Sequence, residues 1–166
     1  MAKKSAKKSS KKTAKKTSKK PAKKAGKKAS KKASAKALAP KPVKTGKGHT
    51  PGELGAIVVA HVNKMGNDAE LWKSHFHPGF VSIEGQGLAW KGRKAVQKKC
   101  EEWMAAHQVH ACKASGPFVG ATGFGVLYDM DVEVKATGQR IKMQEVGVYT
   151  VKNGKVVQEE FMYGGM

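Results

Sequence analysis

The sequence has little cysteine and no long hydrophobic segment. Its two cysteines, Cys100 and Cys112, form neither a CxxC motif nor a disulfide framework, so nothing indicates an oxidising compartment. The longest strongly apolar run, residues 56–60, is far shorter than the ~20 residues that a membrane span needs. No apolar segment follows the first charges, which argues against a secretory signal, and the basic residues there are all lysine, unlike those of a mitochondrial transit peptide. We therefore expect a cytoplasmic protein with no membrane partner.

Acidic and aromatic residues are absent from the first 47 positions. This segment contains 20 lysines, whereas the remaining 119 residues contain 13 basic and 12 acidic side chains. The net charge of +21 therefore divides into +20 for residues 1–47 and +1 for residues 48–166. A segment with this composition cannot bury enough apolar surface to offset the entropy lost on ordering. The composition predicts a disordered lysine-rich arm and linker over 1–47, followed by one folded domain over 48–166.

The arm carries eight Lys-Lys pairs at a strict spacing of four residues. In a helix, each pair would be rotated by about 40° from the previous one, so no single basic face would form. Lysines four residues apart also repel each other, and Pro21 interrupts the run. We expect the arm to be disordered by itself and locally helical at most when a polyanion neutralises it. The paired lysines, which are the predicted nucleic-acid contacts, are Lys3, Lys4, Lys7, Lys8, Lys11, Lys12, Lys15, Lys16, Lys19, Lys20, Lys23, Lys24, Lys27, Lys28, Lys31 and Lys32.

Flexible lysines suit contact with phosphates, and their binding releases condensed counterions, which makes affinity steeply dependent on salt. No arm residue is of a type placed to read bases, so little sequence specificity is expected. The composition resembles the tails of linker histones and of bacterial histone-like proteins. This resemblance favours nucleic acid as the partner, DNA rather than RNA, and implies association with the nucleoid, or with the nucleus in a eukaryote. Another polyanion, or a solvating tail without a dedicated partner, remains an alternative.

The folded part begins with helix signals and continues as strands. Thr50, Pro51 and Glu53 form a capping box, which predicts a helix that ends at Gly66. A short helix over 68–75, a strand over 80–84 and a third helix from Gly92 to about 107 should follow. Strands are expected over 109–115, 123–134, 140–151 and 156–163, the last two joined by the hairpin turn Asn153-Gly154. This order predicts an α+β fold.

Several of these segments together resemble the SnoaL-like branch of the nuclear transport factor 2-like superfamily over residues 53–163. The resemblance rests on Phe80, Trp90-Lys91-Gly92-Arg93, Trp103, Gly116-Pro117-Phe118, residues 144–149, Asn153-Gly154-Lys155 and Glu160-Phe161. It implies a cone-shaped, curved antiparallel sheet wrapped by three N-terminal helices around a pocket, and a homodimer packed through the sheet. Members include cyclases, isomerases and dehydratases, many of which use an Asp or an Asp–His pair. We do not map such a pair onto this sequence.

Two glutamates are candidates for proton chemistry. Glu145 lies in the middle of the apolar-facing positions of its strand, where burial would raise its pKa and suit it to act as a general base or a neutral donor. A structural hydrogen bond or an ion pair at a dimer interface is the favoured alternative. Glu84 ends the first strand and is expected either to pair with Glu145 or to cap the glycine-rich loop.

Aromatic and histidine side chains supply the remaining pocket candidates. Most aromatic residues should be core, and some should line a pocket that accepts a small hydrophobic ligand. The histidines match no established metal-ligand spacing, so neither a metal nor a cofactor is predicted. Asp129, Asp131 and Glu133 alternate along one strand, which is more typical of a solvated face than of a cation site. With Glu145, the pocket candidates are Trp72, His75, Trp103, His107, Tyr128, Tyr149 and Phe161.

The sequence thus favours non-sequence-specific nucleic-acid binding by the arm, carried on a dimeric domain that serves as a platform or ligand-binding module rather than as an enzyme. The alternative is a small-molecule enzyme of the isomerase, cyclase or dehydratase type, or a ligand-binding protein, that the arm anchors to a polyanion.

Overall fold

The computed structural model describes residues 48–164, and the lysine-rich arm lies outside the described residues. Two helices, α1 (Pro51–Asn63) and α2 (Asp68–His75), precede strands β1 (Phe76–Ile83) and β2 (Ala89–Lys91). Helix α3 (Arg93–Ala106) follows, and then strands β3 (His107–Val119), β4 (Gly123–Val134), β5 (Gln139–Lys152) and β6 (Lys155–Tyr163). This order confirms the predicted α+β class.

The helices begin where the capping residues predict. The backbone N–H of Thr50 donates to the Glu53 carboxylate at 2.7 Å, and the Glu53 N–H donates back to the Thr50 hydroxyl at 3.3 Å. This reciprocal pair satisfies N–H groups that the first helical turn leaves free. The Asn67 side chain caps α2 in the same way by accepting from the N–H of Ala69.

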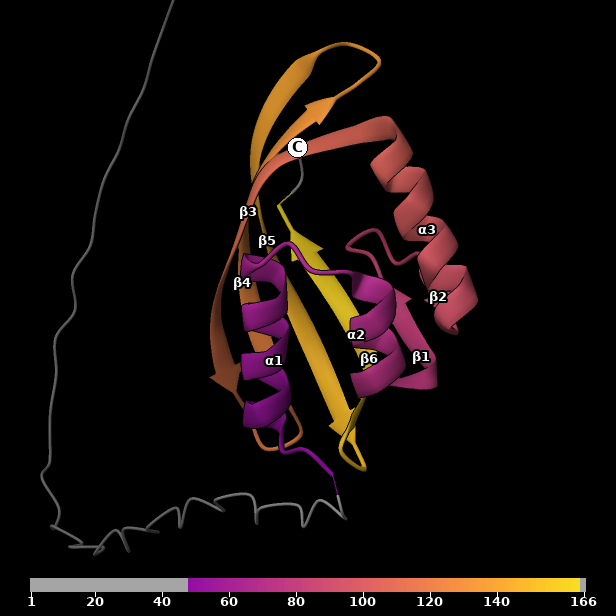
Figure 1. Cartoon of the computed structure of the whole chain (residues 1–166), viewed down its shortest axis with the longest axis vertical. Helices are drawn as coiled ribbons and strands as arrows, with labels where there is room; N and C mark the ends of the chain where they lie inside the picture. Colours follow the sequence, from indigo (N-terminus) through magenta and orange to yellow (C-terminus); the bar gives the residue numbers. More distant parts are fainter. Residues whose placement is uncertain (1–47, 165–166) are drawn as a thin grey trace, which may run out of the picture. The chain divides into compact units, whose positions relative to one another are not determined.

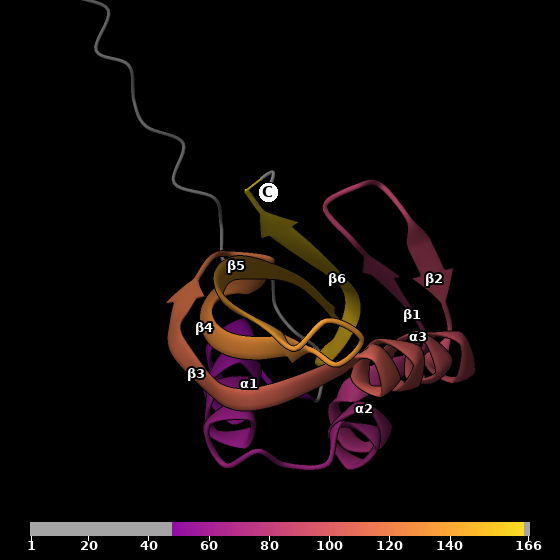
Figure 2. The ribbon, with the colours of Figure 1, turned by 90° about the horizontal axis from the view of Figure 1, so that it is seen from above.

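The six strands form one curved sheet in the order β2-β1-β6-β5-β4-β3, and the sheet wraps around the helices (Figures 1 and 2). The expected all-antiparallel sheet is corrected in one respect, because β1 and β6 run parallel. The hairpin with β2 occupies one edge of β1, so the C-terminal strand pairs along the other edge. Consequently, residues that are far apart in the sequence become neighbours, such as Ser82 and Glu159.

The core lies on the concave face of the sheet. Leu54 and Val58 of α1, Leu71 and Trp72 of α2, and Val96 of α3 are buried with inward residues of the strands. These inward residues occupy alternate positions, as the pleat requires. The buried strand residues of the cluster are Phe76, Phe80, Ala114, Phe124, Val126, Tyr128, Tyr149 and Val156.

One polar contact fixes α1 on the sheet edge. The Asn63 side chain donates to the Ala114 carbonyl at 3.0 Å and accepts from the Ala114 N–H at 2.9 Å. The amide therefore takes the place that the backbone of a further strand would occupy beside β3. This contact supports the position of α1 above the cavity described next.

Strand lengths differ from the sequence predictions at several points. Strand β1 begins at Phe76 rather than at residue 80. Strand β3 extends from His107 to Val119 through the Gly116-Pro117 pair, rather than from residue 109 to residue 115. The register of β3 shifts there, which accommodates the proline within an edge strand. The three-residue strand β2 was not predicted.

Candidate functional site

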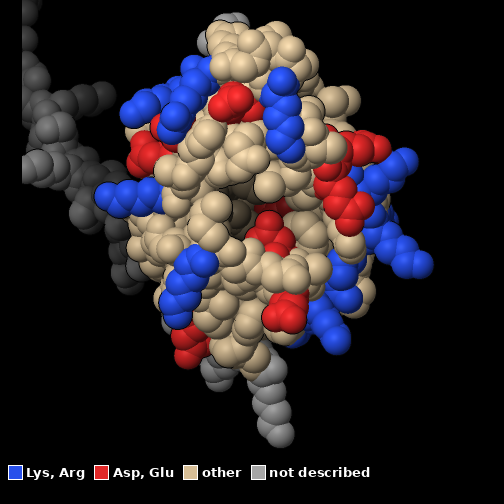
Figure 3. All heavy atoms as spheres, turned by 45° about the horizontal axis from the view of Figure 1, so that its top comes forward, with Lys and Arg blue, Asp and Glu red and all other residues tan. Residues whose placement is uncertain are grey.

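A cavity of about 140 Å³ lies between the helices and the concave face of the sheet. Seen from the end of the domain that is uppermost in Figure 1, the surface is hollowed and acidic atoms lie inside the hollow (Figure 3). Most of the cavity wall is apolar or aromatic, with few polar groups, as in typical small-ligand sites. The lining residues are Val58, Val62, Asp68, Leu71, Trp72, Phe76, Lys99, Cys100, Tyr128, Tyr149, Glu159 and Phe161.

Glu159 is the most deeply buried acid in this wall. It lies in β6 and is only 4% exposed. Burial raises its pKa from 4.5 to about 7, against the opposing effects of the Ser82 hydrogen bond and the Lys99 charge. Its protonated and ionised forms are therefore both populated near neutral pH, which is the condition for a general acid or base. No pattern in the sequence singles out Glu159.

Two tyrosines form a hydrogen-bonded pair beside Glu159. The hydroxyls of Tyr128 and Tyr149 are 2.5 Å apart and buried. Burial raises the pKa of both phenols, so both remain neutral donors. Gly147 makes room for them, because a Cβ at this position would lie 2.9 Å from the ring of Tyr128 and 3.0 Å from that of Tyr149.

Lys99 reaches from α3 into the same wall. Its ammonium lies 2.6 Å from the Glu84 carboxylate and 2.9 Å from the Ser82 hydroxyl, and it packs over the rings of Trp90 and Phe161. The side chain is 14% exposed. Lys99 is thus a direct partner of Glu84, whose charge also acts on Glu145.

Glu145 is half-buried on the concave face, beyond the residues that line the cavity itself. Burial and the nearby Glu84 raise its pKa to about 7, against the effect of Lys99. Its carboxyl is therefore a second group that changes charge near neutral pH.

An Asp–His pair, which could not be mapped from the sequence, lies at the mouth of the cavity. The imidazole of His61 is 3.2 Å from the carboxylate of Asp68, which lines the cavity. Gly66 permits this arrangement, because a Cβ there would lie 2.4 Å from the His61 ring. The pair joins the end of α1 to the start of α2 across a tight turn, and helical periodicity gives no sign of such a contact.

The predicted pocket residues divide into two groups. Trp72, Tyr128, Tyr149 and Phe161 line the cavity, whereas Glu145 and three other candidates do not. His75 packs against His49, with ring centroids 5.4 Å apart.

The remaining two candidates lie near the end of α3. Trp103 stacks on His107, with ring centroids 4.6 Å apart, and is partly exposed. Among residues 48–164, no three potential metal ligands come together.

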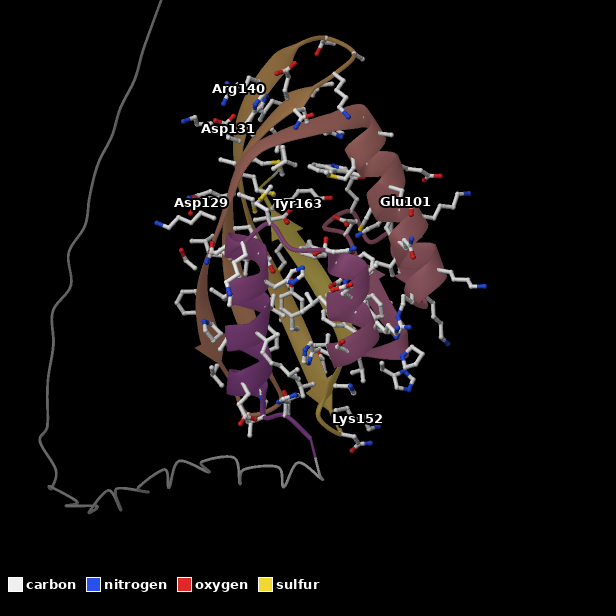
Figure 4. The ribbon with its side chains drawn as sticks, in the orientation of Figure 1. Glu101, Asp129, Asp131, Arg140, Lys152 and Tyr163 are labelled. Carbon is white, nitrogen blue, oxygen red and sulfur yellow. The ribbon has the colours of Figure 1, made fainter. Side chains whose placement is uncertain are left out.

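The alternating acids of β4 each have a partner, as expected for a solvated face. Asp131 accepts two hydrogen bonds from Arg140, at 2.6 and 3.0 Å, which lower the pKa of Asp131. Gln144 donates to Asp129, and Glu133 lies 2.9 Å from His110. Asp131 and Arg140 lie toward the turn between β4 and β5, whereas Lys152 is at the opposite end of the sheet (Figure 4). These acids are thus separate from the cavity.

The predicted lysine contacts to nucleic acid all lie outside the described residues. Of the helices that the structure describes, none has the length and hydrophobicity of a membrane span.

Comparison with known proteins agrees with the fold. The SnoaL-like domain family model matches residues 59–163. A Mesorhizobium loti protein described as a candidate SnoaL-like polyketide cyclase is 32% identical, with a TM-score of 0.64, and the alignment covers 69% of this chain and 100% of that one. Comparison with curated protein sequences finds no significant match.

More distant structures share the fold alone. A Catenulispora acidiphila protein with a ketosteroid isomerase-like fold, in complex with trimethylamine, is 11% identical, with a TM-score of 0.56 over 69% of this chain and 88% of that one. A candidate isomerase from Bacillus subtilis is 13% identical, with a TM-score of 0.54 over 68% and 84%.

Proposed function

We propose that this chain, which belongs to the SnoaL-like domain family, binds a small carbonyl compound in the cavity and moves a proton on its carbon skeleton. The observation that carries the proposal is a buried carboxyl group, Glu159, with a pKa of about 7 in the wall of an apolar cavity. Such a group can accept a proton as the carboxylate and return it as the acid.

The reaction needs a base and a donor for developing negative charge. Glu159 takes a proton from the carbon next to the carbonyl, and the electron pair of the broken C–H bond forms the C=C bond of an enolate. In the tyrosine pair, one hydroxyl proton lies between Tyr128 and Tyr149, so the other is available to the enolate oxygen. In a substrate with a C=C bond conjugated to the enolate, return of the proton from Glu159 to the far carbon gives an isomer. Attack of the enolate carbon on a second carbonyl closes a ring, and the proton from Glu159 passes to the new alkoxide oxygen. Neither outcome requires an oxidant or a reductant.

The cavity limits the size of the reacting group. An apolar cavity of about 150 Å³ accepts benzene, and this one measures about 140 Å³. A single ring, or a chain of similar volume, therefore fits between Trp72 and Phe161. Any larger part of the substrate would extend through the mouth past Asp68.

Deuterium exchange into cyclohexanone, followed by proton NMR in D₂O, tests the proposal. We expect the protein to accelerate the loss of the α-proton signal above the buffer rate, because exchange requires only the first proton transfer. Glu159→Gln should remove the acceleration, whereas Glu101→Gln, a substitution on the exposed side of α3, should not. If no cyclic or linear ketone of this volume exchanges faster with the protein than without it, the proposed reaction is wrong.

We further propose that the arm holds the domain on a polyanion, with DNA favoured over RNA. The supporting observation is the separation of charge, with 20 lysines and no acid in residues 1–47 and near neutrality in the rest. Such binding would place the protein on the nucleoid, or in the nucleus of a eukaryote. The full-length chain should shift duplexes of unrelated sequence equally, and a chain of residues 48–166 should not. Retained binding by the truncated chain would refute this division of labour.

A homodimer through the convex face of the sheet is the third part of the proposal. Several convex positions toward one end of β3–β6 are apolar and partly exposed, and they lie on neighbouring strands in the observed register. Paired acids and bases occupy the same face toward the β4–β5 turn. A second copy is the proposed occupant, because the polar pairs there include both signs of charge and suit a self-complementary contact. The apolar residues are Phe118, Leu127, Val146, Val148 and Met162.

A further inference from the structure

Ser82 lies directly beside Glu159 on the concave face. The two residues are register partners in the parallel pair β1–β6, and both are buried, Ser82 completely. Side chains at paired positions on one face of a sheet lie close enough to interact. The neighbouring Ser82 hydroxyl is one of the influences that lower the pKa of the Glu159 carboxyl.

Lys99 determines how the Ser82 hydroxyl can be oriented. An ammonium group can only donate, so the 2.9 Å contact between Lys99 Nζ and Ser82 Oγ makes the serine oxygen an acceptor. A hydroxyl has one proton, and this proton remains free to donate elsewhere. The acidic side chain next to Ser82 in the register is Glu159.

The position of Lys99 is itself strongly constrained. Its ammonium is 2.6 Å from Glu84, 5.4 Å from the ring centroid of Trp90 and 5.3 Å from that of Phe161. Glu84 follows the last residue of β1, Trp90 lies in β2 and Phe161 lies in β6. The ammonium is therefore held from three directions. A donor with this little freedom can impose one orientation on the hydroxyl that it contacts.

We propose that Lys99 and Ser82 are positioning residues for Glu159: Lys99 turns the Ser82 hydroxyl proton toward one oxygen of the Glu159 carboxyl and leaves the other oxygen directed at the ligand. This inference rests on the proposed function, since the orientation matters to catalysis only if Glu159 transfers a proton. The arrangement also keeps Glu159 from becoming too weak an acid, because both the hydroxyl and the ammonium favour the ionised carboxylate while burial opposes it.

Direct titration of Glu159 in the full-length protein is the test. With ¹³C-labelled glutamate, the nine glutamate carboxyl signals can be followed by NMR, and Glu159→Gln identifies the relevant one. Ser82→Ala should raise the pKa of Glu159 by about one pH unit, because a hydrogen bond to the carboxylate is lost. Ser82→Thr, which keeps the hydroxyl, should restore the wild-type midpoint, and Ser74→Ala on the exposed surface of α2 should leave it unchanged.

The direction of the shift separates positioning from a merely structural role. Loosened packing would admit water to Glu159 and lower its pKa, so an unchanged or lowered midpoint in folded Ser82→Ala overturns the proposal. Lys99→Met provides a second variant and should also raise the midpoint. In the wild-type protein, the chemical shift of Ser82 Cβ should change with pH at the midpoint of Glu159. A Ser82 Cβ shift that stays constant through this midpoint would refute the hydrogen bond, and this measurement needs no variant.

The titration of Glu159 can be measured whether or not the protein catalyses deuterium exchange. If Ser82→Ala raises the midpoint but no ketone exchanges deuterium, the positioning contact stands and the proposed reaction falls. If exchange occurs, the acid limb of its pH profile should move upward in Ser82→Ala by the same amount as the titration midpoint. Exchange with an unmoved acid limb would overturn the positioning role in catalysis.

Discussion

Burial of Glu159 should make the stability of the domain fall as the pH rises. The pKa of this carboxyl is 4.5 in an ordinary setting and about 7 in the folded chain. Between these values the folded chain binds a proton that the unfolded chain has released, so the free energy of unfolding decreases with increasing pH. Above pH 7 the loss is complete, and below pH 4.5 it is absent.

The magnitude follows from the two pKa values. Between pH 5 and pH 8, this single group should reduce the free energy of unfolding by about 2.5 kcal/mol, given 1.36 kcal/mol per pKa unit. Glu159→Gln has nearly the same shape and no titration. Relative to wild type, the variant should therefore become more stable by about 2.5 kcal/mol when the pH is raised from 5 to 8.

Urea unfolding followed by tryptophan fluorescence measures this difference, because the folded domain contains all three tryptophans of the chain. Comparing the variant with wild type at each pH cancels the contributions of the other titrating groups. Glu101→Gln, on the exposed side of α3, should show the same stability difference from wild type at both pH values. An equal difference at pH 5 and pH 8 for Glu159→Gln would mean that Glu159 has an ordinary pKa, and the proposed proton carrier would lose its basis.

Three further perturbations test other parts of the structure. Gly147→Ala should destabilise the domain by roughly 1–3 kcal/mol in urea unfolding, because its Cβ would press on Tyr128 and Tyr149; an unchanged midpoint would show that the tyrosine pair can shift freely. DNA affinity of the full-length chain should fall linearly on a log–log plot against salt, with a slope of roughly −6 to −12, and a shallow slope would argue against counterion release by the arm. Val148→Asp should convert a dimer to a monomer in light scattering, and a wild-type monomer at tens of micromolar would remove the dimer proposal.

The helices and the longest strands could be predicted because their signals are local. The capping box of Thr50 and Glu53 marks the start of α1, and the alternation from Phe124 to Val134 marks β4. Strand β2 escaped detection because three residues are too short for a periodic pattern. The parallel pairing of β1 and β6 joins segments about 75 residues apart and has no local signal.

The difference between local and long-range signals also explains which residues of the cavity could be predicted from the sequence. Tyr128 and Tyr149 occupy apolar-facing positions, so sequence periodicity was sufficient to place them in the pocket. Glu159 stands between Gln158 and Glu160, and three adjacent polar residues do not indicate which one is buried. Its environment is created by Ser82 and Lys99, which reach it from distant parts of the chain.

The proposed DNA contacts precede the folded domain, whereas the proposed reaction site lies inside it. The described chain begins at Gly48, which packs closely against Gly154 in the turn between β5 and β6. The hollow that contains acidic atoms is seen when the domain is viewed from the side away from Gly48 (Figure 3). A polyanion held by residues that precede Gly48 therefore need not cover the mouth at Asp68. Small molecules could reach the cavity while the arm is engaged, so DNA binding and deuterium exchange should not compete. If saturating DNA suppressed deuterium exchange, DNA binding would be coupled to the cavity. The conclusion that the two activities are independent would then be wrong.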